Sequence, residues 1–550
     1  MEVAFRCSAM FLDLANLSAI TIALPTLRKE FSISTGNLQW IISAYALTFG
    51  AFLMLGGRGG DSFGYVNHSE MRPESSSDAE LMCNYRHRPM LLFGMSFFAL
   101  FTLVSALTPT FIGLVIARAF QGIGAAFTIP SAQAHIAIHF PDPAKKASAL
   151  GIWGASGSLG FIIGLILGGI LTDLLGWRWI FWASLMFSGV VTPAAYLFLP
   201  AGDRFRHRRA PSPEVPSNDD QPTNSKPLLK SIKERLLRFD APGILLGLPG
   251  IITLTYALTS SNQDGWGSPP IISTLVVSIF LLISFILYER QAASAILPTH
   301  LFKSSSFNLT LILAINTYAV RQACTYFLTV QLQSFGNSPI HTSVLFIPLG
   351  VSALISNTIA GRLVPILGAR VMFIVGWSLS IPGVLLFSFI EDNSSYWRFT
   401  FPAMILYIAG IGAVYITANF VVVSSASKSD QGAAAGVFNV ALQVGGSILG
   451  LAVLTAIAQG IEKKFGPPDM PAGDFSHVAY QSVYYSCVIL CVVGLVLSIF
   501  FIRVPDSMTG SIWKTSTVPA ATTGSTEPSA NHFELQERTT IVKNSREVVK

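Results

Sequence analysis

The chain has 550 residues, of which 51% are hydrophobic and only 12% are charged, and its formal net charge is +6. A soluble protein of this length carries about twice that charged fraction, so the composition excludes one. The basic residues lie in particular loops between apolar blocks and the five cysteines are scattered, which argues against nucleic-acid binding, a disulfide framework and a zinc site.

Apolar blocks of about eighteen residues or more are long enough to cross the bilayer core as helices. The sequence therefore predicts an all-α, multi-pass membrane protein with fourteen transmembrane helices. The predicted spans are residues 7–27, 38–57, 89–108, 110–132, 147–171, 178–199, 240–259, 270–288, 306–332, 342–362, 369–390, 399–423, 432–458 and 480–502.

Lys and Arg gather in alternate loops, most densely in residues 201–239. The positive-inside rule places those loops in the cytosol, and an even number of spans then places both chain ends there. Residues 201–239 are polar, basic and rich in Pro and Ser, which predicts a cytosolic linker. Residues 504–550 are rich in Ser and Thr, which predicts a disordered cytosolic tail. We expect no cleavable signal, so that the first helix directs insertion.

Asp13 is a carboxylate inside the first apolar block. Charged side chains inside membrane helices are costly and are functional by default. Asp13 is therefore a candidate proton-binding group. The alternative is that it caps the start of a helix or forms an ion pair at the cytosolic rim.

A glycine-rich stretch with an acid follows the second span. Its residues are Gly57, Arg58, Asp61 and Gly64, and the basic cluster that should close the same turn ends at Arg88. Glycines let a backbone turn sharply and let helices approach, and an acid can pair with a helix N-terminus and with an arginine. We expect this set to hold the cytosolic side closed in one state of a transport cycle. If this stretch stood alone, the alternative interpretation, a generic glycine turn with a solvent-exposed acid, would be preferred.

Residues 66–85 separate the two halves of that turn and show neither a helical nor a strand period. Two interpretations are open for this anomalous cytosolic insertion. One is a retained intron, since a valine codon can begin with GT and an arginine codon with AG. The other is a true insertion, which an exposed loop tolerates at low cost. A transcript that encodes residues 66–85 would exclude the intron.

The fourth and fifth spans carry two further motifs. Arg118, followed by Gln121 and Gly122, lies inside an apolar helix, where a charge is expected to be functional. The alternative is that Arg118 pairs with a buried carbonyl or acid. In the fifth span Gly160, Gly164 and Gly168 are four residues apart, with Gly169 beside the last. Small residues at that spacing line one helix face and allow close helix packing.

Polar residues within the spans are candidates for the wall of a substrate cavity: Asn16, Asn316, Arg321, Asn439 and Gln443. Arg321 either contacts an anionic or polar substrate or ties two helices together, and the sequence favours neither. His135 and His139 have the spacing of metal ligands but lack a third ligand, so no metal site is predicted. Asn393 begins an Asn-Ser-Ser sequon in a predicted non-cytosolic loop and is a candidate glycosylation site.

These segments resemble signatures of the major facilitator superfamily. Residues 57–64 resemble its GxLxDxxGRR/K motif, residues 114–124 its LxxxRxxQGxG motif, and residues 160–169 the antiporter motif GxxxGPxxGG, with Leu165 in place of the proline. Residues 12–25, 177–181 and 430–436 resemble the fourteen-span drug:proton antiporter branch, most closely fungal efflux proteins of the aminotriazole-resistance type. The resemblance covers residues 8–503.

The resemblance implies two six-helix bundles with two extra helices between them. The bundles would be residues 1–200 and 289–503, and the extra pair residues 240–288. In such folds the substrate binds near the membrane midplane. The family's arginine at the position of Arg118 is tied to proton coupling, and the resemblance implies that role here.

We therefore expect proton-driven export of a drug, toxin or secondary metabolite by alternating access, with Asp13 and Arg118 as the coupling residues. The expected energy source is the proton gradient, with no cofactor and no enzymatic reaction, in a monomer of the plasma membrane or, second, of the vacuolar membrane. One alternative is a facilitator or importer of a nutrient or inorganic acid, which the missing antiporter proline leaves open. The other is a membrane solute sensor, against which the short, low-complexity tail argues.

Overall fold

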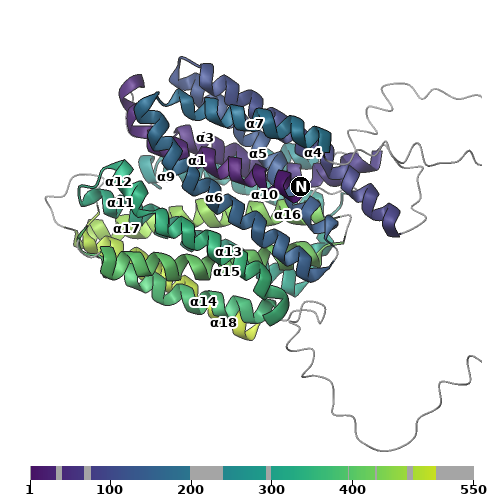
Figure 1. Cartoon of the computed structure of the whole chain (residues 1–550). Coiled ribbons are helices and arrows are strands. Elements are labelled where there is room, and N and C mark those ends of the chain that lie inside the picture. Colours follow the sequence, from purple (N-terminus) through teal and green to yellow (C-terminus); the bar gives the residue numbers. More distant parts are fainter. Residues whose placement is uncertain are drawn as a thin grey trace, which may run out of the picture. The chain divides into compact units, whose positions relative to one another are not determined.

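The structure is a computed structural model, and it describes residues 2–32, 40–66, 76–140, 142–198, 240–292, 299–393, 396–427, 430–466 and 475–502. This part of the chain is built of helices and contains no strand (Figure 1). The predicted linker and tail lie outside the described residues and stay predictions.

Six long helices form the N-terminal half: α1 (Glu2–Phe31), α3 (Trp40–Val66), α4 (Ser76–Leu107), α5 (Phe111–His139), α6 (Pro143–Leu174) and α7 (Arg178–Phe198). The pair α9 (Ala241–Asp264) and α10 (Pro269–Glu289) follows. The C-terminal half contains α11 (Ser305–Ser334), α12 (Pro339–Leu345), α13 (Ile347–Leu367), α14 (Ala369–Phe387), α15 (Phe401–Ser425), α16 (Gln431–Val440), α17 (Leu451–Phe465) and α18 (His477–Phe500). Short helices complete it: the 3-10 helix η2 (Thr299–Lys303) and the π-helices η4 (Tyr396–Thr400) and η5 (Ala441–Gly450).

Side-chain caps determine where helices α5 and α6 begin. The hydroxyl of Thr110 accepts a hydrogen bond from the Gly113 amide at 3.2 Å and starts α5. The carboxylate of Asp142 accepts one from the Ala144 amide at 3.2 Å, directly before Pro143 at the first position of α6. These residue types satisfy amides that the first helical turn leaves unpaired.

The chain is a multi-pass membrane protein. Thirteen helical segments in its described part are long and apolar enough to cross a membrane, and they correspond to every predicted span except 306–332. That span is helix α11, thirty residues long. Its polar face, which includes Arg321, Gln322 and Thr325, lowers its mean hydropathy. With α11 the structure accommodates the predicted fourteen helices.

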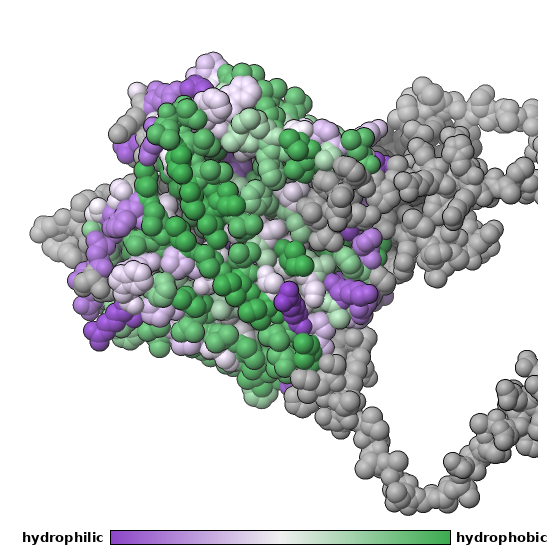
Figure 2. All heavy atoms as spheres, in the orientation of Figure 1, coloured by the Kyte–Doolittle hydropathy of each residue, from purple (hydrophilic) through white to green (hydrophobic). Residues whose placement is uncertain are grey.

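The outer surface suits lipid. Figure 2 shows hydrophobic residues over a broad part of the visible face. Helix α10 exposes a series of large apolar side chains, with Ile272, Val276, Phe280 and Ile283 among them. So large an apolar surface is unfavourable in water and favourable against acyl chains.

The glycine-rich turn and the insertion differ from expectation. Helix α3 continues to Val66, so residues 57–64 are helical and do not form a tight turn. Helix α4 begins at Ser76, so residues 76–85, predicted to lack a helical period, are helical as well. The run Ala79-Glu80-Leu81-Met82 consists of strong helix formers, which outweighs the lack of an apolar stripe. Residues 67–75 lie outside the described part.

The glycines of α6 let it pack closely against α1, as predicted. A Cβ atom added at Gly160 or Gly164 would overlap the α1 backbone at Phe11 or Ala15, and one at Gly168 would lie 2.6 Å from Ala19 Cα. Such contacts leave room only for glycine.

Gly169 does not belong to this contact, because a Cβ there would meet no atom within 4 Å. A residue next to Gly168 on a helix points about 100° away from it. Contrary to the prediction, Gly169 thus takes no part in the packing of α6 against α1.

The contrast between these glycines makes a prediction. Gly164→Ala would place a methyl group into the α1 backbone, and overpacking of this kind costs about 1–3 kcal/mol. We expect a lower melting temperature and a lower yield of monodisperse protein by size-exclusion chromatography. Gly169→Ala, in the same helix, is the matched control and should be neutral. Equal behaviour of the two variants would contradict the packing role.

The start of α7 is tied to the end of α1. The carboxylate of Glu30 accepts hydrogen bonds from Trp177 Nε1 at 2.5 Å and from Arg178 Nη1 at 2.7 Å. The Arg178 guanidinium also lies over the Trp177 ring, 4.3 Å from its centre. Burial raises the pKa of Glu30, but the hydrogen bonds from Arg178 and Trp177 outweigh burial, and the net pKa lies below the ordinary value of a glutamate.

This shift predicts a pH-dependent contribution to stability. The ionised Glu30 stabilises the fold above its unfolded pKa of about 4.3, and the contribution is lost as the pH falls through the lower folded pKa. We expect Glu30→Gln to lower the melting temperature slightly at pH 7, with the difference from the native chain shrinking in acid. Asp173→Asn, which removes an exposed carboxylate of α6, is the control. A difference that persists below the folded pKa would contradict this account.

Candidate functional site

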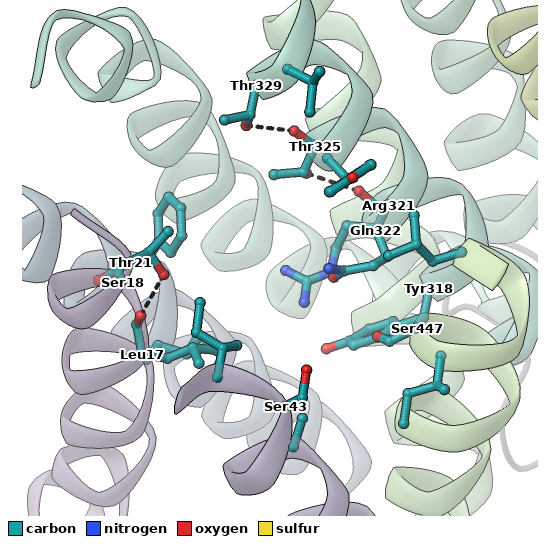
Figure 3. A pocket seen from close by; sticks show the side chains of 18 of the residues that line it. Leu17, Ser18, Thr21, Ser43, Tyr318, Arg321, Gln322, Thr325, Thr329 and Ser447 are labelled. Carbon is teal, nitrogen blue, oxygen red and sulfur yellow. Dashed lines mark hydrogen bonds between the residues drawn. The ribbon is translucent and has the colours of Figure 1, made fainter. Parts of the chain in front are cut away.

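A cavity of about 2070 Å³ lies between the helices of the two halves. Figure 3 shows part of its lining: Leu17, Ser18 and Thr21 of α1 and Ser43 of α3 on one side, and Tyr318, Arg321, Gln322, Thr325 and Thr329 of α11 with Ser447 of η5 on the other. The space is larger than the roughly 300–1,000 Å³ usual for small-molecule sites, but its mostly apolar walls with a few polar groups are typical of them.

The cavity extends toward one end of the helices. Its lining includes Arg28 near the end of α1, Gln333 near the end of α11, and Lys463 and Gly466 at the end of α17. The distribution of Lys and Arg predicts that these ends are non-cytosolic.

The opposite end is closed by two glycine contacts between the halves. A Cβ on Gly57 of α3 would lie 2.8 Å from Gly436 Cα of α16. A Cβ on Gly151 of α6 would lie 2.8 Å from Gly361 Cα and from the Asn357 carbonyl oxygen of α13. Both pairs of helices touch along their backbones, so no ligand passes between them here.

Two hydrogen bonds between the halves accompany these contacts. Asn439 Nδ2 on α16 donates to Gln133 Oε1 on α5. Asn357 Nδ2 on α13 donates to Ser158 Oγ on α6 at 3.3 Å. Breaking them would leave buried polar groups unpaired, which costs about 1–3 kcal/mol each. The closed end is therefore held by polar bonds as well as by packing.

The predicted gate set is only partly described. Gly57 lies at the closed end, in contact with α16, and its role in a gate stays a prediction. Arg88 Nη2 donates to the Tyr196 carbonyl oxygen at 2.6 Å, and the guanidinium lies 5.5 Å from the centre of the Tyr196 ring. Arg88 thus binds α7. The surroundings of Arg58, Asp61 and Gly64 lie outside the described part, so their role stays a prediction.

Asp13 lies at the border of the cavity. Its side chain is 8% exposed and belongs to the cavity lining. The hydroxyl group of Tyr45, on α3, donates a hydrogen bond to Asp13 Oδ1. Asp13 is thus neither a helix-start cap nor a rim ion pair, but a buried carboxylate with a hydroxyl partner.

Arg118 is fully buried behind the same tyrosine. Its guanidinium lies 4.4 Å from the centre of the Tyr45 ring. Arg118 Nε donates to the Ile41 carbonyl oxygen at 3.2 Å, and Nη1 donates to Asn16 Oδ1 at 2.5 Å and to Gln121 Oε1 at 2.6 Å. The structure therefore brings Asp13 and Arg118 together through Tyr45, a residue that no sequence pattern indicates.

Two further residues of α5, Gln121 and Gly122, support this group. Gln121 Nε2 donates to Thr102 Oγ1 at 2.7 Å, which orients the amide toward Arg118. A Cβ at Gly122 would overlap the backbone at Tyr45, so this glycine lets α5 approach α3. The motif thus holds Arg118 and Tyr45 in contact.

The predicted cavity residues divide into two groups. Arg321, Asn439 and Gln443 line the cavity, as expected. Asn16 does not, because it is 1% exposed and accepts the hydrogen bond of Arg118. Asn316 does not either: its Nδ2 donates to the Leu490 carbonyl oxygen of α18 at 2.7 Å. Five residues along an α-helix turn it by about 140°, so Asn316 and Arg321 face different neighbours.

Further lining residues could have been found from spacing. Tyr318, Gln322, Thr325 and Thr329 recur every three or four residues along α11 and all line the cavity. Polar groups at that spacing on a membrane helix indicate a water-facing stripe. No comparable signal points to Tyr415 of α15, whose ring centre lies 5.6 Å from that of Tyr318.

The glycosylation candidate Asn393 is not among the residues that line the cavity. No group of three His, Cys, Asp or Glu side chains in the described ranges is placed to hold a metal ion. Asn393 Oδ1 accepts a hydrogen bond from Asn337 at 2.6 Å, and its Nδ2 donates to the Phe335 carbonyl oxygen at 3.1 Å. Glycosylation of Asn393 stays a prediction.

Comparisons with known proteins agree with this architecture. The family model described as Major Facilitator Superfamily matches residues 7–450 and 309–543. A puromycin resistance protein of Streptomyces alboniger is 31% identical over 460 residues, which cover 82% of this chain and 80% of that protein. A multidrug transporter of Aspergillus fumigatus is 26% identical over 449 residues, which cover 80% of this chain and 76% of the relative.

The solved structure of a proton:xylose symporter is similar in fold, with a TM-score of 0.57 and 12% identity. The match covers 91% of this chain and 95% of the symporter. At this identity the likeness concerns the fold alone.

Proposed function

The chain belongs to the major facilitator superfamily, and from that premise we propose that it is a proton-coupled exporter of small organic compounds. The observation that carries the proposal is the group Asp13–Tyr45–Arg118 at the border of the central cavity. A carboxylate placed there can bind a proton from the cavity while a buried arginine responds to its charge. The names of the relatives, which concern puromycin resistance and multidrug transport, favour export of drug-like compounds.

The coupling follows from the positions of these residues. Asp13 and Tyr45 lie on α1 and α3, which both line the cavity. Protonation of Asp13 removes the negative charge that faces Tyr45 and Arg118, so the two protonation states favour different arrangements of α1 and α3. A proton can shift a conformational equilibrium only by binding one state more tightly than the other. In this proposal the proton enters from the non-cytosolic side and leaves Asp13 when the cavity faces the cytosol.

Alternating access would use the two glycine contacts. Here the halves touch at Gly57–Gly436 and Gly151–Gly361, which corresponds to a state closed toward the predicted cytosolic side. Export requires a second state in which these contacts separate and the cavity takes up substrate from the cytosol. Since helices of one chain enclose the cavity, we propose a monomer as the working unit, placed in the plasma membrane.

Growth of a pump-deficient yeast tests the proposal. Cells that express the chain would be challenged with a panel that includes puromycin and weak organic acids. We expect protection, and we expect Asp13→Asn and Arg118→Ala to remove it at equal surface expression. Sealed vesicles with an imposed pH gradient would give the direction. Movement of solute toward the cytosolic side would contradict export and would indicate a facilitator or importer. Absence of transport despite surface expression would favour a sensor.

A further inference from the structure

Arg321 is a cation in the wall of the cavity. Figure 3 shows its guanidinium reaching from α11 into the cavity above the Tyr318 ring, and its Cζ lies 4.4 Å from the ring centre. Its Nε is buried and has no hydrogen-bond partner. In the part of the chain that the structure describes, no carboxylate lies within ion-pair distance of it.

The backbone around Arg321 is held in place. Its carbonyl oxygen accepts hydrogen bonds from Tyr407 at 3.0 Å and from Thr325 at 2.8 Å. Tyr318 is fixed by η5, because a Cβ at Gly446 would lie 2.5 Å from Tyr318 Cβ. The helix segment that carries Arg321 and the ring beneath its guanidinium are thus positioned before any ligand binds, which reduces the entropic cost of binding.

The described charges of the cavity favour an anion. The basic lining residues are Arg28, Arg321 and Lys463, and the acidic ones are Asp13 and Glu462. Both acids already accept hydrogen bonds. Asp13 accepts one from Tyr45, and Glu462 Oε2 accepts two from Ser476, at 2.7 Å from N and 2.6 Å from Oγ. Arg321 has no such acid partner, so an uncompensated positive charge faces the cavity.

The surroundings of Arg321 also suit an aromatic body. The Tyr318 and Tyr415 rings lie 5.6 Å apart, centre to centre, and both line the cavity. Gln322 and Gln443 add amide groups to the same lining. A guanidinium binds carboxylates and similar oxyanions through two parallel N–H donors, and tyrosine rings offer faces for stacking.

We propose that Arg321, Tyr318 and Tyr415 form a subsite for the oxyanion of an aromatic organic acid, with the carboxylate on Arg321 and the ring against the tyrosines. This inference rests on the proposed function, because it assumes that the cavity is the transport site. It extends that function by naming the charge and class of the substrate. A ligand carboxylate would supply the counter-ion that Arg321 lacks.

Binding to the purified full-length chain in lipid nanodiscs tests the subsite. The probes are naphthalene-2-carboxylate and its neutral, nearly isosteric amide, measured by equilibrium dialysis without a pH gradient. We expect the carboxylate to bind about ten- to a hundredfold more tightly than the amide, the range of a hydrogen bond to a charged group. Arg321→Gln should remove this preference and leave amide binding in place. Arg321→Lys should keep part of this preference, because lysine retains the positive charge but lacks the two parallel N–H donors of the guanidinium.

Arg28→Gln is the matched control, since it removes another lining cation. It should retain the preference for the acid. An equal loss in Arg28→Gln would show a diffuse positive potential and would overturn the subsite, as would equal binding of acid and amide by the native chain. The comparison of acid and amide binding by the native chain does not depend on the folding of any variant. Export of neutral drugs without any preference for the acid would overturn this inference alone, whereas acid binding without export would overturn the proposed function alone.

Discussion

Asp13→Asn is expected to lower transport driven by a pH gradient, while substrate exchange at equal pH on both sides continues. The amide keeps the size of the side chain and still meets the Tyr45 hydroxyl, so the cavity should persist. It cannot bind and release a proton, so the gradient no longer biases the conformational equilibrium. We expect gradient-driven transport to fall by about 5- to 150-fold, the usual range of coupling between two binding events.

The assay is uptake into sealed proteoliposomes, with and without an imposed pH gradient, beside an exchange assay in the same vesicles. Asp173→Asn, at an exposed carboxylate of α6, is the control and should behave as the native chain does. Tyr45→Phe keeps the ring that faces Arg118 and removes only the hydroxyl, so it should lose part of the coupling. Full gradient-driven transport by Asp13→Asn would show that the coupling group lies elsewhere.

Gly151→Ala is expected to shift the chain away from the state that is closed at the glycine contacts. The added methyl group would lie 2.8 Å from Gly361 Cα and from the Asn357 carbonyl oxygen, both across the boundary between the halves. Overpacking of this kind costs about 1–3 kcal/mol, which changes an equilibrium constant by about 5- to 150-fold. Because the overlap lies between the halves, it disfavours the closed arrangement without disturbing either bundle.

Accessibility of a cysteine placed at this end, for example at Ala147 beside Gly361, reports the shift. Its labelling by a water-soluble maleimide from the cytosolic side should increase in Gly151→Ala. Gly169→Ala adds the same methyl group to the same helix where no atom lies within 4 Å, so it should leave labelling unchanged. If both variants have similar melting temperatures, increased labelling reflects a conformational shift and not unfolding. Unchanged labelling in Gly151→Ala would mean that this contact does not gate the cavity.

The membrane class, the helix positions and the glycine face of α6 could all be read from local patterns. An apolar block long enough to cross a bilayer forms a helix wherever it is placed, and three glycines four residues apart share a face in any helix. Arg118 could be singled out because a charge inside an apolar helix needs a specific partner.

Which residues become neighbours could not be read in this way. Tyr45 joins Asp13 to Arg118 only because α1, α3 and α5 meet at one point, and residues 13, 45 and 118 carry no shared pattern.

The same holds for Asn16 and Asn316, which the sequence predicts to line the cavity. Asn16 and Asn316 have the same chemistry as Asn439, but helix packing turns them toward Arg118 and toward α18. Composition and spacing reveal which side chains are polar and which face of their own helix they occupy. The direction of that face depends on contacts between segments far apart in the chain, and these arise only when the helices pack.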